Sequence, residues 1–461
     1  MESYRTEQDS IGTKQVPQKA YYGVQSLRAY ENFKITGTKV HPEFIKSIVE
    51  IKKAAAITNK EAGVLKANIA DALAIACDEI LEGRFVDNFI VDAIQGGAGT
   101  SLNMNANEVI ANRAIEILGG EKGDYKIVHP NDHVNCGQST NDAYPSAGKI
   151  AVVRLLDKAI AELERMQEVL ALKASEFENV IKMGRTEMQD AVPISLGQTF
   201  MAYASAVKRD IARFNTAKLE MSKLNMGGTA IGTGINADSY YIKNIVENVS
   251  KVTGLKLTQA EDLIDATQNL DSFVFVSGVI KSCAATLSKI ANDLRLMSSG
   301  PRTGFGEINL PAKQNGSSIM PGKINPVIPE VINQIAFNIM GNDTTITMAA
   351  EGGQLELNAF EPVIFYCLFQ SLDTIANGIR VFVKDCIEGI TVNKGRCETE
   401  VTESLGIVTA LCPYIGYTKA SSLAKKALKE GKNIKDVILE EKIMPENELE
   451  NVLNPLNMIN N

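Results

Sequence analysis

A polar loop between residues 314 and 326 reads QNGSSIMPGKINP, and its composition restricts the chemistry that it can do. The loop holds Ser317, Ser318, Lys323 and Asn325, but it has no histidine, cysteine or carboxylate. Its polar side chains therefore offer hydrogen-bond donors and, on Lys323, one positive charge. Such groups suit an anionic ligand, because donors and cations aimed at a carboxylate stabilise its charge.

Three further stretches carry hydroxyl and amide side chains at the expected starts of helices or next to glycines. They are GGAGTSLNMNANEV with Thr100 and Ser101, QSTNDAYP with Ser139, Thr140 and Asn141, and GRTEMQD with Thr186 and Glu187. N-capping alone would explain a hydroxyl at a helix start. Backbone N–H groups at a helix N-terminus also bind anions. Several such stretches in one chain favour a carboxylate or phosphate ligand.

A glycine-rich stretch, GGTAIGTGINAD at 227–238, superficially resembles a dinucleotide-binding loop. It lacks the preceding strand and the βαβ context that such a loop requires. We interpret it as a glycine-rich turn.

Composition and charge exclude several classes of protein. The net charge of -8 argues against a nucleic-acid partner and weakly against an anionic membrane surface. Three histidines are too few for a metal site built on several of them, so we expect no metal ligands. Seven cysteines without a CxxC pair predict reduced, mostly buried thiols. The charged N-terminus and the absence of an apolar run of about 20 residues predict a cytoplasmic protein.

Long helices must position these polar stretches. From Asp142 to about Gly389 the apolar residues follow helical spacing. In 276–297 the apolar residues, including Cys283, recur at alternating spacings of four and three positions and so form one apolar seam along a helix. No β alternation of useful length is found in this middle part. The pattern predicts a mainly α fold with domains at 1–140, 141–395 and 396–461. Helices of this length favour oligomerisation, because partner subunits can cover their apolar stripes, although a long bundle within one chain is the alternative.

Together these stretches resemble the aspartase/fumarase superfamily over nearly the whole chain. GSSIMPGKINP at 316–326 is similar to its signature loop, and GAGTSLNMNANEVIANRA and QSTNDAYP are similar to two other active-site segments. AYYGVQSLRAYENFKITG and NPVIPEVINQ are most similar to the superfamily members that deaminate aspartate.

The resemblance implies a three-domain fold whose central helices form a 20-helix bundle in a homotetramer. It implies active sites that are each assembled from three subunits, and no cofactor. The implied reaction is the reversible anti elimination of ammonia from L-aspartate, which gives fumarate through an enediolate.

Residue roles follow from the same resemblance. Ser317 matches the general base that removes the Cβ proton. Lys323 and Asn325 match residues that hold the α-carboxylate, and Asn141 and Thr186 match residues near the amino group. The positions that match residues holding the β-carboxylate are Thr100, Ser139, Thr140 and Ser318. Ser101 is a further candidate for substrate binding.

Glu187 departs from the pattern, because many relatives have a histidine there. A carboxylate could attract the substrate ammonium. Alternatively, Glu187 is a helix-start residue paired with Arg185. His129 resembles part of a second dicarboxylate site of some fumarases, although a structural use is the better interpretation. Two other functions stay open: a class II fumarase, which would hydrate fumarate to malate, and a catalytically silent structural protein with a lyase fold.

Overall fold

The structure is a computed structural model that describes residues 3–459. Helices dominate this part of the chain, and the strands within it form only four two-stranded sheets. The predicted mainly α class is confirmed. Contacts divide the chain into two compact units. The first contains the chain up to Ile160 with Ala212–Ser282 and Asn338–Ile375, and the second contains Ala161–Ile211, Cys283–Phe337 and the chain from Ala376 onward.

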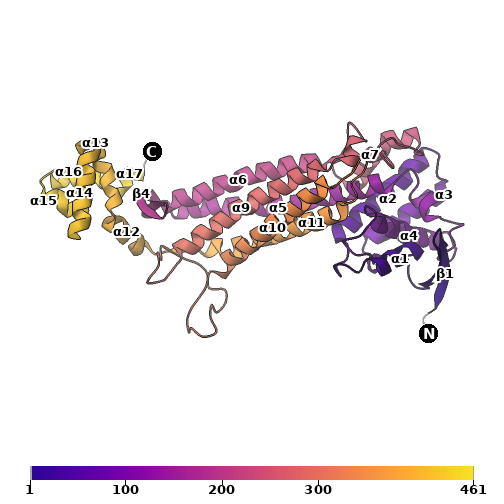
Figure 1. The fold of residues 1–461 in the computed structure, drawn as a ribbon, viewed down its shortest axis with the longest axis horizontal. Helices are drawn as coiled ribbons and strands as arrows, with labels where there is room; N and C mark the ends of the chain where they lie inside the picture. Colours follow the sequence, from indigo (N-terminus) through magenta and orange to yellow (C-terminus); the bar gives the residue numbers. More distant parts are fainter. Residues whose placement is uncertain (1–2, 460–461) are drawn as a thin grey trace. The chain divides into compact units, whose positions relative to one another are not determined.

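Five long helices contribute a segment to each unit (Figure 1). They are α5 (Thr140–Glu176), α6 (Leu196–Met221), α9 (Asp271–Met297), α10 (Val327–Glu351) and α11 (Glu361–Asp385). The predicted seam of α9 is buried over its whole length, with Cys283 at 0% exposure. Polar contacts also join these helices: Ser277 donates to Asp343 at 2.8 Å in the first unit, and Arg295 donates to Asn333 at 3.0 Å in the second.

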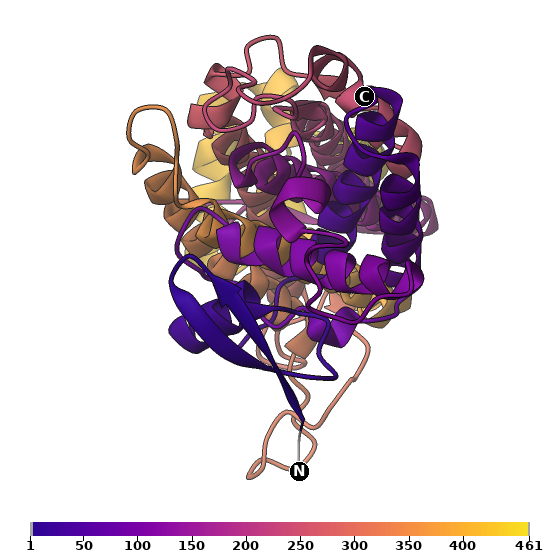
Figure 2. The same cartoon turned by 90° about the vertical axis from the view of Figure 1, so that its right-hand side faces the viewer.

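The first unit is built around helix α4 (Thr100–Ile117). Most residues of α4 are buried, and they lie on every face of the helix. The unit's other helices are α1 (Val24–Asn32), α2 (Pro42–Glu61), α3 (Ala67–Leu81), α7 (Ser239–Thr253) and α8 (Asp265–Gln268). Its strands are β1 (Tyr4–Asp9), β2 (Gly12–Pro17), β5 (Lys223–Leu224) and β6 (Thr258–Gln259). The hairpin β1–β2, indigo in Figure 2, is an element that the sequence analysis did not predict.

The second unit contains a hairpin and a group of short helices. The hairpin is β3 (Ile181–Thr186) with β4 (Gln189–Ser195), and β7 (Ile308–Asn309) pairs with β8 (Thr391–Val392). The helices are α12 (Lys394–Glu403), α13 (Cys412–Ile415), α14 (Tyr417–Glu430), α15 (Ile434–Glu440), α16 (Glu446–Val452) and α17 (Pro455–Ile459). The expectation that the middle of the chain lacks strands was therefore wrong at 181–195. The domain boundaries at 140 and 395 stay a prediction.

The cysteines form no disulfide within the described residues, and five of the seven are buried. Among the described helices, α9 alone has the length and apolarity to cross a membrane, and 56% of its apolar window is buried inside the protein.

Candidate active site

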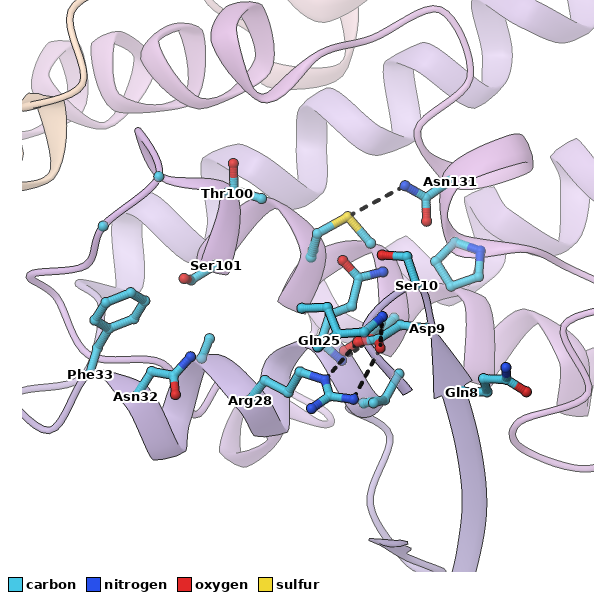
Figure 3. A pocket seen from close by; sticks show the side chains of 18 of the residues that line it. Gln8, Asp9, Ser10, Gln25, Arg28, Asn32, Phe33, Thr100, Ser101 and Asn131 are labelled. Atoms are coloured by element: carbon cyan, nitrogen blue, oxygen red, sulfur yellow. Dashed lines mark hydrogen bonds and ion pairs between the residues drawn. The ribbon is translucent and has the colours of Figure 1, made fainter. Parts of the chain in front are cut away.

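Thr100 and Ser101 begin helix α4 beside a pocket of about 700 Å³ in the first unit (Figure 3). Gly99 precedes them with φ +89°, and a Cβ there would lie 2.3 Å from the ring of Tyr144. Glycine is therefore required for the chain to enter α4 at this point. No side chain caps this helix. The capping explanation is therefore wrong for Thr100 and Ser101.

Ser139, Thr140 and Asn141 stand at the start of α5. The Ser139 hydroxyl accepts a hydrogen bond from the Asn141 N–H at 3.2 Å, and the Asp142 carboxylate accepts one from the Ser139 N–H at 2.9 Å. This reciprocal pattern is a capping box. The Thr140 and Asn141 side chains take no part in this cap, so capping of α5 is compatible with ligand binding by this segment.

The two helix starts meet at Thr140. Its Oγ1 lies 3.4 Å from the hydroxyl of Thr100, which donates to it, and it also accepts from Asn103 Nδ2 at 3.1 Å. Because the Thr140 oxygen accepts from both neighbours, its own O–H remains to donate elsewhere. The structure thus brings the predicted residues Thr100 and Thr140 together, with the hydroxyl of Thr140 set as a donor.

Lys52 on α2 fixes this arrangement from behind. Its ammonium group donates to Asn103 Oδ1 at 2.6 Å and to the amide oxygens of Asn135 and Gln138 at 2.9 Å each. The Asn103 oxygen is therefore occupied, and its nitrogen must face Thr140. Burial lowers the pKa of Lys52 to about 7, while three acceptors match the three N–H groups of the protonated form. Sequence reasoning missed Lys52, although a lysine within the apolar run of α2 was a detectable signal.

The pocket extends from Thr100 and Ser101 to the β1–β2 hairpin (Figure 3). His129 also lines it. Across it, Arg28 forms an ion pair with Asp9 at 2.8 Å. His129 Nδ1 accepts hydrogen bonds from the N–H groups of Asn131 and Asp132, both at 3.2 Å. His129 therefore caps the short π-helical turn Pro130–Val134, which is a structural use.

The loop 314–326 belongs to the second unit and is closed at its base. The Gly316 N–H donates to the Lys323 carbonyl, and Asn325 Nδ2 donates to the Gly316 carbonyl, both at 2.8 Å. A Cβ on Gly316 would lie 2.7 Å from the backbone nitrogen of Asn325, so close packing requires glycine at this position. Gly322 has φ +77° and open space around it. The loop is thus a clamped unit with an exposed tip.

The side chain of Ser317 folds back onto the backbone of its own loop. Its Oγ accepts hydrogen bonds from the N–H groups of Ile319 at 3.2 Å and Met320 at 2.9 Å. Hydrogen bonds to an oxygen favour its negatively charged form. The sequence did not indicate these two donors, because they depend on the turn that the loop adopts.

Thr186 and Glu187 lie at the exposed end of hairpin β3–β4. Glu187 and Met188 both have positive φ, 52° and 66°, which identifies a two-residue type I′ turn. The Arg185 guanidinium contacts Glu307 at 2.7 Å and Glu400 at 2.9 Å. The alternative in which Glu187 starts a helix and pairs with Arg185 is therefore wrong.

The predicted residues fall into two groups, one in each unit. Thr100, Ser101 and 139–141 belong to the first unit, and 186–187 and 317–325 belong to the second. Within the first group, hydrogen bonds connect the segments directly. Among residues 3–459, no three His, Cys, Asp or Glu side chains are arranged to hold a metal ion.

Comparisons with known proteins place the chain in a family. A family model described as Lyase matches residues 12–341, and one described as Fumarase C C-terminus matches residues 407–460. Aspartate ammonia-lyase of Bacillus subtilis is 52% identical, covering 99% of this chain and 96% of the relative. The enzyme of the same name from Helicobacter pylori is 52% identical, with 99% and 98% covered, and that from Escherichia coli is 47% identical, with 99% and 96% covered.

Solved structures of related proteins have the same fold as this chain. The fumarate lyase:delta crystallin of Brucella melitensis bound to cobalt has a TM-score of 0.97 at 45% identity, covering 100% of both chains. The class II fumarase of Schistosoma mansoni has a TM-score of 0.95 at 34% identity, covering 99% of both chains. The chain therefore belongs to the aspartate ammonia-lyase family of the aspartase/fumarase superfamily.

Proposed function

We propose that this protein catalyses the reversible deamination of L-aspartate to fumarate and ammonia, with Ser317 as the general base. Family membership supports the reaction, because relatives at 47–52% identity over nearly the whole chain are aspartate ammonia-lyases. The observation that carries the mechanism is the pair of backbone N–H groups aimed at Ser317 Oγ.

The chemistry requires stabilisation of negative charge. A Cβ–H next to a carboxylate is very weakly acidic, and its removal gives a dianionic enediolate. Ammonia then leaves from the neighbouring carbon on the opposite face, in an anti elimination. Each donor aimed at the developing charge contributes on the order of 3 kcal/mol, as in oxyanion holes. A site made of hydroxyl, amide and lysine side chains meets this need.

Ser317 can act as a base only if its pKa falls far below that of an ordinary alcohol. The N–H groups of Ile319 and Met320 stabilise the alkoxide, and Lys323 adds a positive charge on the same loop. Closure of the loop over the substrate would exclude water and strengthen these interactions.

The remaining residues surround the substrate. Thr100, Ser139, Thr140 and Ser318 hold the β-carboxylate, with Ser101 beside them, and Lys323 and Asn325 hold the α-carboxylate. Asn325 Nδ2 also closes the base of the loop in this structure. Its binding role therefore uses its second N–H group or follows loop closure.

Asn141, Thr186 and Glu187 face the amino group in this proposal. Glu187 has no ion pair with any residue between 3 and 459, and it stands at an exposed turn where a second subunit can bring substrate to it. Its carboxylate attracts the ammonium group of aspartate. The variant Glu187→Gln should therefore raise the KM for aspartate, and an unchanged KM would contradict the contact.

The active enzyme is a homotetramer in the cytoplasm whose sites combine segments of three subunits, and it uses no cofactor. Large apolar side chains exposed on the long helices support the assembly, including Phe337 at 63% and Met348 at 69% on α10. Exposed apolar side chains that line up along one face of a helix are typical of a protein interface.

One assay tests the function. Absorbance of fumarate is followed with L-aspartate or L-malate as the sole substrate, for the wild type and for Ser317→Ala. We expect fumarate from aspartate, at most traces from malate, and loss of nearly all activity in Ser317→Ala with an unchanged melting temperature. Faster turnover of malate would identify a fumarase instead, and inactivity on both would favour a structural protein. A variant that keeps more than a few per cent of activity would exclude Ser317 as the base.

A further inference from the structure

Asp142 is a buried carboxylate that the proposed mechanism does not use. Its Oδ1 accepts a hydrogen bond from the Ser139 N–H at 2.9 Å, which closes the cap of α5. Its Oδ2 accepts from the N–H groups of Gly227 at 3.2 Å and Thr229 at 3.0 Å. The side chain thus ties the start of α5 to the glycine-rich stretch at 227–238, whose role the sequence left open.

This stretch has a conformation that needs external support. Gly227 has φ +94°, and Thr229, which is not glycine, has φ +55°. A non-glycine residue in this region carries conformational strain that surrounding contacts must offset. Those contacts come from Asp142 and from Asn225, whose carbonyl accepts from the Gly228 N–H at 3.0 Å and whose Nδ2 donates to the Asn141 carbonyl at 2.9 Å.

The stretch in turn fixes the side chain of Asn141. Asn141 Nδ2 donates to the Ala230 carbonyl at 2.7 Å. A carbonyl oxygen can only accept, so the amide nitrogen of Asn141 must face Ala230 and its Oδ1 must face the other way. This Oδ1 accepts no hydrogen bond from any residue of the described chain. Asn141 therefore presents an acceptor to the ligand.

An acceptor discriminates between substrate groups. An ammonium group carries only donors and fits Asn141 Oδ1, whereas a carboxylate oxygen would be repelled by it. We propose that Asp142 is a positioning residue for amino-group recognition, which holds the 227–230 segment so that the Ala230 carbonyl fixes Asn141 as an acceptor. This inference rests on the proposed function, because it assumes that Asn141 meets the amino group.

The variant Asp142→Asn tests the inference, because it keeps the size of the side chain but can no longer accept from all three backbone N–H groups, those of Ser139, Gly227 and Thr229. In the reverse reaction, the KM for ammonium should rise about tenfold, as expected for loss of one charge-assisted hydrogen bond. The inhibition constant of succinate, which has both carboxylates and no amino group, should stay within about twofold. The control is Asp238→Asn, which changes the N-cap of α7 in the same stretch and should alter neither value.

A purely structural role would weaken the binding of ammonium and succinate in parallel, and that result would overturn the inference. Unchanged values for both would also overturn it. If Asp142→Asn does not fold, Asn225→Ala should show the same selective loss, because Asn225 supports the segment without contacting Ser139. The proposed function is tested separately, by the activity of the wild type on aspartate. If the wild type deaminates aspartate but the variants show no selective rise in the KM for ammonium, this inference alone is rejected.

Discussion

Two neighbouring side chains at the start of α5 present opposite hydrogen-bonding groups. Thr140 is set as a donor by Asn103, and Asn141 is set as an acceptor by the Ala230 carbonyl. Neither polarity is visible in the letters S-T-N-D, because each depends on a residue that is remote in the sequence. The buried ions Lys52 and Asp142 stand behind these contacts. Sequence analysis named the groups that are proposed to face the ligand and missed the ones that orient them.

The variant Asn103→Asp should reverse the polarity of Thr140. An aspartate pairs with Lys52 and fits the same space, but its carboxylate accepts from the Thr140 hydroxyl and draws the O–H away from the ligand. We expect the inhibition constant of succinate and the KM for aspartate to rise together by about tenfold, the effect of one hydrogen bond to a charged group.

Steady-state kinetics measure the KM for aspartate, and inhibition by succinate gives its inhibition constant. The control is Asn107→Asp on the same helix, which contacts Asn135 and not Thr140. An unchanged succinate constant in Asn103→Asp would show that Thr140 does not donate to a carboxylate.

Glu361 gives a prediction about pH. It is the first residue of α11, 3% exposed, and burial raises its pKa to about 8 from a usual value of 4.5. The folded protein therefore holds a proton that the unfolded chain releases. This contribution to stability is full below a pH of about 4.5 and is lost as the pH rises through about 8.

The variant Glu361→Gln cannot ionise and should be free of this loss. Between pH 5 and pH 9, the melting temperature of the wild type should fall by several degrees more than that of the variant. Circular dichroism measures both melts. Glu351→Gln, at the exposed end of α10, should follow the wild type at every pH. Parallel curves for Glu361→Gln and the wild type would contradict the raised pKa.

At the scale of elements, helical periodicity predicted the long helices, because their apolar stripes repeat over many turns. The hairpins were missed. Strand β4 reads QDAVPIS, in which a proline interrupts the alternation, and β1 and β2 are polar strands of six residues each. Their pairing comes from turns and from tertiary contacts that no local pattern shows.

Arg185 links hairpin β3–β4 to the carboxylates of Glu307 and Glu400. Its partner Glu307 is fully buried and otherwise meets only Lys182, at 3.2 Å, among the charged side chains of the described residues. Arg185→Met would leave the Glu307 carboxylate poorly paired, at a cost of about 3 kcal/mol in the free energy of unfolding. The hairpin that carries Thr186 and Glu187 would also loosen, which raises the KM for aspartate.

Arg396→Met is the matched control. Arg396 also pairs with Glu400, at 2.8 Å, but its side chain is 48% exposed. Exposed pairs of this kind contribute less than about 1 kcal/mol. Urea denaturation compares the two variants, and equal losses would show that Arg185 has no special role in anchoring the hairpin.

At the scale of the molecule, the two groups of predicted site residues belong to different compact units. The amino-acid composition of the chain could not indicate how a complete site forms from them. The long helices pointed to an oligomer, and exposed apolar residues such as Phe337 and Met348 on α10 agree with that expectation. These two residues are eleven positions apart and lie on one face of the helix, so a partner helix can cover both.

Shared active sites predict activity from mixtures of inactive subunits. In a tetramer whose sites take Asn141 from one subunit and Ser317 from another, Asn141→Ala and Ser317→Ala should each be inactive alone. After the two variants are unfolded together in equal amounts and refolded, about a quarter of the sites should draw both intact residues, with random assembly. The deamination rate of the mixture should therefore reach about a quarter of the rate of wild-type protein refolded in the same way. A mixture as inactive as its parents would show that each site takes both residues from the same subunit.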